Sequence, residues 1–297
     1  MLSDNPQIFS PEHFKFLSEK HLASYSKAEP FPHTLIDNFL PEEILNEVID
    51  EFPEEGDLQW NEMENQKEKK TALQDQNFMN PAVQSILFKL NSSMVIKFLE
   101  KLTGIHGLIP DPHLWGGGLH QIKKGGHLGI HADFNFHPLL NLDRRLNLLV
   151  FLNKDWKEEY GGQLELWNKD MTKCCKKILP IFNRCVIFNT TDFTFHGHPD
   201  PLNCPEGRTR RSLSLYYYTN GRPLDELSDP HTTIFRNRPN DKSQKNTRDM
   251  LINRITPPIY HDLLRIYNIY GDKNASNKPL DFLKTILKRF IPKWSKF

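Results

Sequence analysis

The sequence predicts an α+β fold in which antiparallel strands form a sandwich or barrel between two helical regions. Three observations carry this prediction. Apolar residues recur at helical spacing through the first hundred residues, and short β segments separated by Gly, Pro and Asn begin near residue 112. Helical periodicity returns after Gly221 in a basic tail. A chain of 297 residues can bury roughly three-quarters of its unfolded surface, so it is long enough for a substantial core.

The first elements are a helix, a strand and a second helix. Ser10 followed by Pro11 is typical of a helix N-terminus, with the serine as N-cap and the proline at the first helical position. Residues 32–39 alternate apolar and polar side chains, which predicts a strand. Residues 41–52 open with proline and two glutamates and place their apolar residues on one face, which predicts a helix.

Residues 55–80 are polar and rich in Glu, Gln, Asn and Lys, so we expect an exposed loop there. A longer helical run follows over residues 83–102 and ends at Gly104, the usual residue type for a left-handed C-cap. This helical half is expected to support the strands that come next.

The strands of the second region are short and separated by turn residues. The expected segments are 118–123, 128–132, 146–152, 163–167, 178–181, 184–189 and 210–218. Beyond them, residues 259–267 and 280–291 have helical periodicity. We therefore divide the chain into a support region over 1–111, a β core over 112–222 and a basic helical extension over 223–297.

Composition narrows the function classes. Lys and Arg number 38 against 37 Asp and Glu, so the net charge of +1 gives no overall field for nucleic acid, and we expect no nucleic-acid partner. The four cysteines form no CxxC pair, and no charged, apolar leader opens the chain, which favours a reducing, cytoplasmic location.

No stretch approaches the ~20 apolar residues of a membrane-spanning helix. The basic amphipathic segment 280–297 is compatible with contact to a membrane surface or a protein partner, and equally with packing on the rest of the chain.

Histidines cluster in the β region. Of the 13 histidines, 8 lie between His106 and His198. His131 and Asp133 occupy positions i and i+2 of an expected strand, where side chains share one face and can converge on one ion. The same spacing recurs at His198 and Asp200, so it proves little alone.

Support comes from the expected strand 210–218, whose alternation puts Arg210 and Ser212 on one polar face. A guanidinium in such a place offers a planar fork suited to a carboxylate. A third metal ligand is available from His196 or His198. Two imidazoles and one carboxylate leave open positions on an ion, as in non-haem Fe(II) oxygenases.

Several ordered motifs carry a family resemblance over residues 115–220. They are Gly125-Gly126, His131-Ala132-Asp133-Phe134, Phe151-Leu152-Asn153-Lys154-Asp155-Trp156, Gly161-Gly162-Gln163-Leu164-Glu165-Leu166, Pro180 before 184–188, His196, and Gly207 through Arg210-Arg211-Ser212. Together they resemble the prolyl 4-hydroxylase-like branch of the Fe(II)/2-oxoglutarate dioxygenases. The resemblance implies that the β core is a double-stranded β-helix, a jelly-roll or cupin-like fold.

The resemblance also implies roles for particular residues. His131, Asp133 and His196 would be the iron ligands and, with Arg210, the catalytic set. Arg210 would anchor the distal carboxylate of 2-oxoglutarate, and Ser212 would share it. We favour His196 over His198 because it directly follows a strand and precedes a glycine that permits close approach.

Two positions depart from the family. Phe151 and Ile122 stand where relatives carry tyrosines, one of which touches 2-oxoglutarate. Asn147 or Gln121 is expected to supply the lost hydrogen bond.

The implied activity is hydroxylation of an unactivated C–H bond, in proline or another amino-acid side chain, free or peptidyl, with release of succinate and CO2. Fe(II) would be the cofactor, 2-oxoglutarate and O2 the co-substrates, and ascorbate a reductant. Two other classes are weighed: a metal-binding β-barrel module without catalysis, and a cupin-like metal isomerase or hydrolase. Segment 55–80 and the tail after 221 are the expected lids over the substrate.

Overall fold

The helices of the first hundred residues begin where the sequence marks them, with one difference. In the computed structural model, which describes residues 9–53 and 60–241, Ser10 accepts a hydrogen bond from the backbone N–H of His13 and starts α1. The expected helix over 83–102 is two helices that meet at Asn91 and Ser92. Both side chains compete with helical hydrogen bonds, which explains the break. Gly104 closes the second helix in the left-handed conformation, with φ 73°. The helices are α1 (Pro11–Tyr25), α2 (Glu42–Asp50), α3 (Pro81–Leu90) and α4 (Ser93–Thr103).

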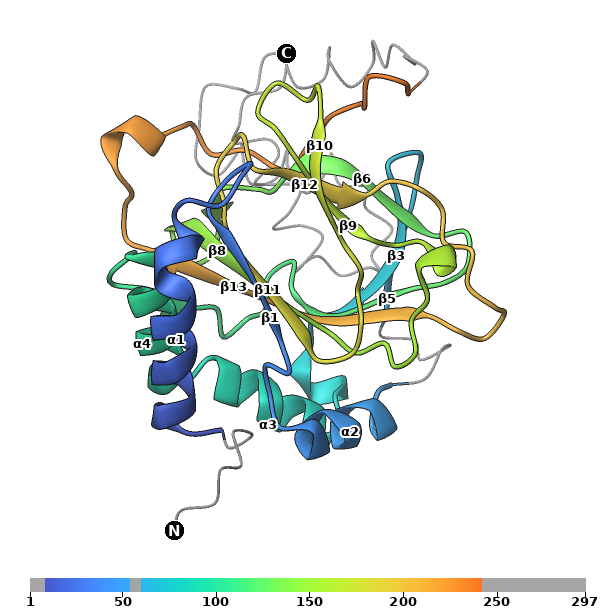
Figure 1. Ribbon diagram of the computed structural model, residues 1–297, viewed down its shortest axis with the longest axis horizontal. Coiled ribbons are helices and arrows are strands. Elements are labelled where there is room, and N and C mark those ends of the chain that lie inside the picture. Colours follow the sequence, from blue (N-terminus) through green and yellow to red (C-terminus); the bar gives the residue numbers. More distant parts are fainter. Residues whose placement is uncertain (1–8, 54–59, 242–297) are drawn as a thin grey trace, which may run out of the picture. The chain divides into compact units, whose positions relative to one another are not determined.

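The strands belong to a single antiparallel sheet that curls on itself (Figure 1). Its main path runs β1-β11-β8-β13-β5-β3-β6-β12-β9-β10. The strands are β1 (His33–Asp37), β2 (Asn61–Glu64), β3 (Glu68–Leu73), β4 (Ile109–Pro110), β5 (Gly118–Ile122), β6 (His127–Ala132), β7 (Phe136–His137), β8 (Leu142–Phe151), β9 (Leu164–Trp167), β10 (Cys174–Ile178), β11 (Arg184–Asn189), β12 (Phe195–His198), β13 (Arg210–Thr219) and β14 (Ile234–Phe235). This arrangement is the double-stranded β-helix that the sequence predicts.

Two expectations about local structure are wrong. The polar segment expected as a loop over 55–80 contains the hairpin β2–β3, and β3 pairs with both β5 and β6. Only Ala72 and Leu73 of this hairpin are buried, so its sequence carries almost no apolar signal. The strand expected at 178–181 lies earlier, as β10, because its solvent-facing residues are polar and hide the alternation.

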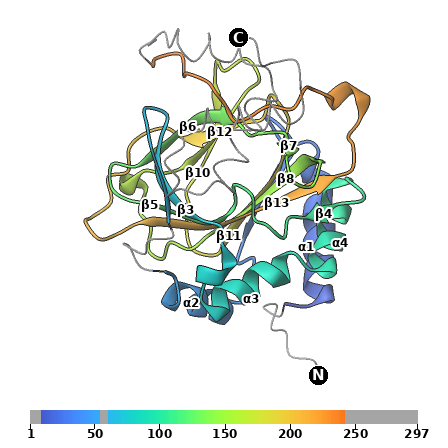
Figure 2. The ribbon, with the colours of Figure 1, turned by 180° about the vertical axis from the view of Figure 1, so that it is seen from behind.

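The four helices cover one side of the curled sheet, against β1, β11, β8 and β13 (Figures 1 and 2). The largest hydrophobic cluster joins the two layers: Phe14, Leu45 and Leu99 from the helices pack with strand residues such as Val150 and Leu215. Apolar burial of this kind stabilises at about 25 cal/mol per Å². The helical half therefore supports the sheet, as expected.

Strand β13 divides its side chains between the two faces. Leu213, Leu215 and Tyr217 belong to the helix-facing core, and the Tyr217 hydroxyl donates to the carbonyl of Leu90 at 3.0 Å. Arg210 and Ser212 therefore point to the opposite, inner face of the curled sheet. The expected alternation is confirmed, and the interior receives polar side chains.

The segment after β13 returns to the sheet. Strand β14 pairs with β6, placing Phe235 opposite His131. The expected helices at 259–267 and 280–291, and the basic segment 280–297, lie outside the described residues. Within the described ranges, no helix has the length and apolar character needed to cross a membrane. The division at residues 111 and 222 stays a prediction.

Candidate metal centre

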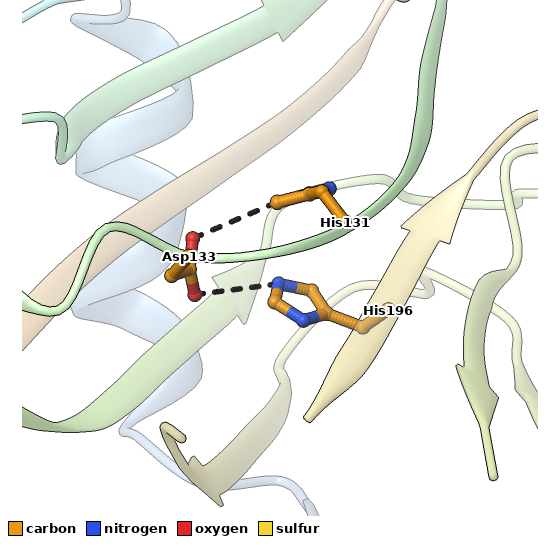
Figure 3. A group of neighbouring side chains, drawn as sticks. All are labelled: His131, Asp133 and His196. Atoms are coloured by element: carbon orange, nitrogen blue, oxygen red, sulfur yellow. Dashed lines mark ion pairs between the residues drawn. The ribbon is translucent and has the colours of Figure 1, made fainter. Parts of the chain in front are cut away.

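Two neighbouring strands bring three potential metal ligands together. His131 is near the end of β6, Asp133 follows that strand directly, and His196 lies on β12. The strand register pairs His196 with His131. One ligand atom from each residue lies within 4.8 Å of the others, and all three side chains are buried (Figure 3).

Backbone carbonyls orient both imidazoles. The Nδ1 atom of His131 lies 2.8 Å from the carbonyl oxygen of Gly129, and that of His196 lies 3.0 Å from the carbonyl oxygen of Thr194. An Nδ1–H that donates to a carbonyl leaves the Nε2 lone pair for a metal. The two Nε2 atoms face Asp133, at 3.6 Å from Oδ1 for His131 and 3.5 Å from Oδ2 for His196.

Electrostatics favour the ligand-binding protonation states. Burial lowers the pKa of His196 to about 4, despite the opposing effect of Asp133. Burial by itself would raise the pKa of Asp133, but Arg144 and the two imidazoles lower it well below its ordinary value. Asp133 and His196 are therefore deprotonated at neutral pH, as metal coordination requires. The donor set and its geometry fit Fe(II).

Gly197, between His196 and His198, allows β12 to approach β6 closely. A Cβ atom there would lie 2.7 Å from the carbonyl oxygen of Gly129 and 2.8 Å from that of Leu128. Backbone atoms cannot yield as a flexible side chain can. The close approach that favoured His196 in the sequence is thus present.

We expect Gly197→Ala to push β12 away from β6 and so separate His196 from its two partners. Loss of ligand orientation typically weakens metal binding by about 10–100-fold. Titration calorimetry with Mn(II), on protein shown by circular dichroism to be folded, measures this change. Wild-type metal affinity in a folded variant would contradict the role assigned to the glycine.

Arg144 and Asn147 of β8 both contact the carboxylate of Asp133. The Asn147 amide donates to Asp133 Oδ2 at 2.7 Å, and Arg144 Nη2 lies 3.2 Å from the same oxygen. Arg144 also donates to the side-chain Oδ1 of Asn147, from Nε at 3.1 Å and from Nη2 at 2.7 Å. Its guanidinium lies 3.5 Å from the ring centroid of Tyr216 and 4.3 Å from that of Phe134.

Sequence reasoning missed Arg144. The side chain is only 1% exposed, although Arg is rarely buried without a partner. The signal that the sequence offers is an arginine within a long apolar strand. A register shift between Tyr217 and Tyr218, on the strand that pairs with Arg144, interrupts the regular alternation and hides which face of the sheet Arg144 takes. Asp133 therefore has a partner set that spacing alone could not indicate.

Arg210 lies in the sheet interior, 5% exposed, with its guanidinium 4.9 Å from the ring centroid of Phe151. Its Nε donates to the carbonyl oxygen of Gly162 at 2.9 Å. Burial lowers the pKa of Arg210 to about 9, so the group remains cationic at neutral pH. Among residues 9–53 and 60–241 it has no acidic partner, and Ser212, also buried, lies on the same face.

The two residues expected to replace a lost hydrogen bond lie in different surroundings. The Asn147 amide is engaged with Asp133. Gln121 pairs with Arg211 in the strand register, so its side chain takes the face opposite to that of Arg210. Their binding of the co-substrate stays a prediction.

His198 stands outside the group of three. It is buried on β12, and neither ring nitrogen has a hydrogen-bond partner among the described residues. Burial, and then Arg210, lower its pKa well below the ordinary value. The geometry thus brings His196, not His198, to Asp133.

Comparisons with known proteins agree with this geometry. Residues 117–218 match the 2OG-Fe(II) oxygenase superfamily. Curated protein sequences give no significant match.

Two solved structures share the fold. One is a prolyl hydroxylase from Trichoplax adhaerens, solved in complex with a peptide fragment of the hypoxia inducible factor oxygen degradation domain. It is 19% identical, with 70% of this chain and 91% of that chain covered and a TM-score of 0.53. The other is a prolyl-4-hydroxylase from Pseudomonas putida, 16% identical, with coverages of 70% and 100% and a TM-score of 0.51. Residues 117–218 therefore form a segment that is similar to the 2OG-Fe(II) oxygenase superfamily of Fe(II)- and 2-oxoglutarate-dependent dioxygenases, and the curled sheet carries the metal-ligand group inside.

Proposed function

We propose that this dioxygenase hydroxylates a C–H bond of proline or of another amino-acid side chain, free or peptidyl. His131, Asp133 and His196 would hold the iron. The observation that carries the proposal is the convergence of two Nε2 atoms and one carboxylate within 4.8 Å inside the sheet. Fe(II) with 2-oxoglutarate and O2 supplies the oxidising chemistry, which converts C–H to C–OH with succinate and CO2 as the other products.

The protein's own residues bind and orient the reactants. Arg210, cationic and without an acidic partner in the described ranges, would bind the distal carboxylate of 2-oxoglutarate, with Ser212 beside it. Phe151 and Phe188, both fully buried, would keep water from Arg210 and His196, since the Phe188 ring centroid lies 4.7 Å from that of His196 and the Phe151 ring lies 4.9 Å from the Arg210 guanidinium. A dry site of this kind strengthens the ion pair.

The amino-acid substrate is proposed from the likeness of the fold to prolyl hydroxylases. The similar structure from Trichoplax holds a peptide, which favours testing peptidyl substrates first. We also propose ascorbate as the reductant. The cysteine pattern supports the further proposal of a cytoplasmic location.

Turnover tests the proposal directly. Purified protein incubated in air with Fe(II), ascorbate and carbon-14-labelled 2-oxoglutarate should release labelled succinate or CO2, and release should rise with the correct substrate. Proline-containing peptides, free proline and free lysine form the first panel, with oxygen consumption as a second readout. Tight Fe(II) binding with no turnover across the panel would support a metal-binding module without catalysis. An activity unaltered in Arg210→Ala would instead favour a cupin-like isomerase or hydrolase.

A further inference from the structure

His198 is a buried polar side chain outside the metal-ligand group. It is 3% exposed, and both of its ring nitrogens are buried without a hydrogen-bond partner among the described residues. An unsatisfied buried polar atom costs about 1–3 kcal/mol of stability. Native structures keep few such groups, so each one needs an explanation.

The surroundings of His198 define what could satisfy it. The groups with the largest electrostatic effects on it are Arg210, Lys70, His127 and His131. Lys70 is paired with Glu68 at 3.5 Å, whereas Arg210 has no acidic partner in the described ranges. A buried guanidinium without an acidic partner and a buried imidazole with an unsatisfied N–H together favour a bound anion with at least two acceptor oxygens.

The position of His198 fits the far end of the co-substrate. His196 and His198 are two residues apart on β12, where the register to β6 shifts between them, and two residues of a regular strand span about 6.6 Å. This separation is comparable with the carbon chain of a five-carbon diacid whose other end lies at the metal. Phe151, on the neighbouring strand β8, lies with its ring centroid 4.9 Å from the Arg210 guanidinium and offers no hydrogen-bond donor.

We propose that His198 binds the distal carboxylate of 2-oxoglutarate together with Arg210. The proposal rests on the proposed function. His198 would donate one N–H to the carboxylate, while Arg210 supplies the positive charge and Ser212 a hydroxyl.

The test compares two ligands that share the metal-binding end. 2-Oxoglutarate and oxalate can both chelate a metal, but only 2-oxoglutarate carries a distal carboxylate. We measure the Kd of each for Mn(II)-loaded protein by titration calorimetry. In His198→Phe, which keeps a flat ring without nitrogens, the Kd for 2-oxoglutarate should rise about 10- to 100-fold, as expected for a hydrogen bond to a charged group, while that for oxalate stays constant.

His198→Leu is a second variant with a different shape and the same expected result, so the test survives if one substitution prevents folding. His33→Leu is the matched control. His33 is also 3% exposed on a strand, but its ring bonds to Phe31 and Lys176, so its loss should leave both Kd values unchanged.

Three outcomes separate the hypotheses. A selective loss for 2-oxoglutarate supports His198 as a carboxylate ligand. Equal losses for both ligands, or no loss in either folded variant, overturn the inference. Failure of the wild-type protein to bind 2-oxoglutarate with Mn(II) present would instead refute the proposed function.

Discussion

Asp133→Ala should abolish Fe(II) binding and, with it, succinate release. Asp133 is the only carboxylate in the group of three, and both Nε2 atoms face its oxygens. Fe(II) is a weak binder among first-row divalent metals, so two imidazoles alone would hold it loosely. We expect no heat of binding in anaerobic calorimetry at Fe(II) concentrations that saturate the wild-type protein.

Asp133→Ala is also expected to destabilise the fold, and this effect must be measured separately from the loss of Fe(II) binding. Arg144 is almost fully buried and pairs with Asp133, and breaking a buried ion pair destabilises by about 3–5 kcal/mol. Urea unfolding of the metal-free protein measures this loss. Two variants serve as controls. Asp133→Asn keeps the size of the side chain, and Asp37→Ala removes an aspartate that pairs with Arg184 outside the metal-ligand group. Fe(II) binding at wild-type affinity by folded Asp133→Ala would exclude the residue as a ligand.

The core strands could be predicted because their sequence pattern has a physical cause. In β13, Leu213 and Leu215 face the helical layer while Arg210 and Ser212 face inward. The alternation of apolar and polar residues along the sequence therefore indicates which side chains face which side of the sheet. Strand β11 matches its expected bounds for a similar reason, since it is central and apolar.

The misassigned elements are those whose stability comes from distant partners. The hairpin β2–β3 has a polar sequence, and its backbone pairs with β5 and β6, which lie about fifty residues later. Nothing within 55–80 contains that information. Strand β12, Phe195–His198, is four residues long and was not expected, because a short histidine- and glycine-rich segment lacks strand propensity.

The metal-ligand group could be approached from the sequence only in part. The spacing of His131 and Asp133 is local, and the strand geometry makes it informative. The choice between His196 and His198 depends on a register between two strands, and the support of Asp133 by Arg144 depends on a third strand, β8. The packing of Arg144 against Tyr216 is a tertiary contact, which the spacing of residues in the sequence does not indicate.

Arg210→Ala should weaken 2-oxoglutarate binding roughly a hundredfold or more, because loss of a buried bidentate ion pair costs about 3–5 kcal/mol. Fe(II) affinity without 2-oxoglutarate should change little, since Arg210 is not among the metal-ligand group. Arg211→Ala is the matched control: the neighbouring arginine points to the other face, where its guanidinium lies 4.4 Å from the Phe52 ring. Calorimetry of both variants with Mn(II) and 2-oxoglutarate measures the difference. Equal Kd values for Arg210→Ala, Arg211→Ala and the wild-type protein would remove Arg210 from the co-substrate site, because a buried guanidinium that touches the carboxylate cannot be lost without cost.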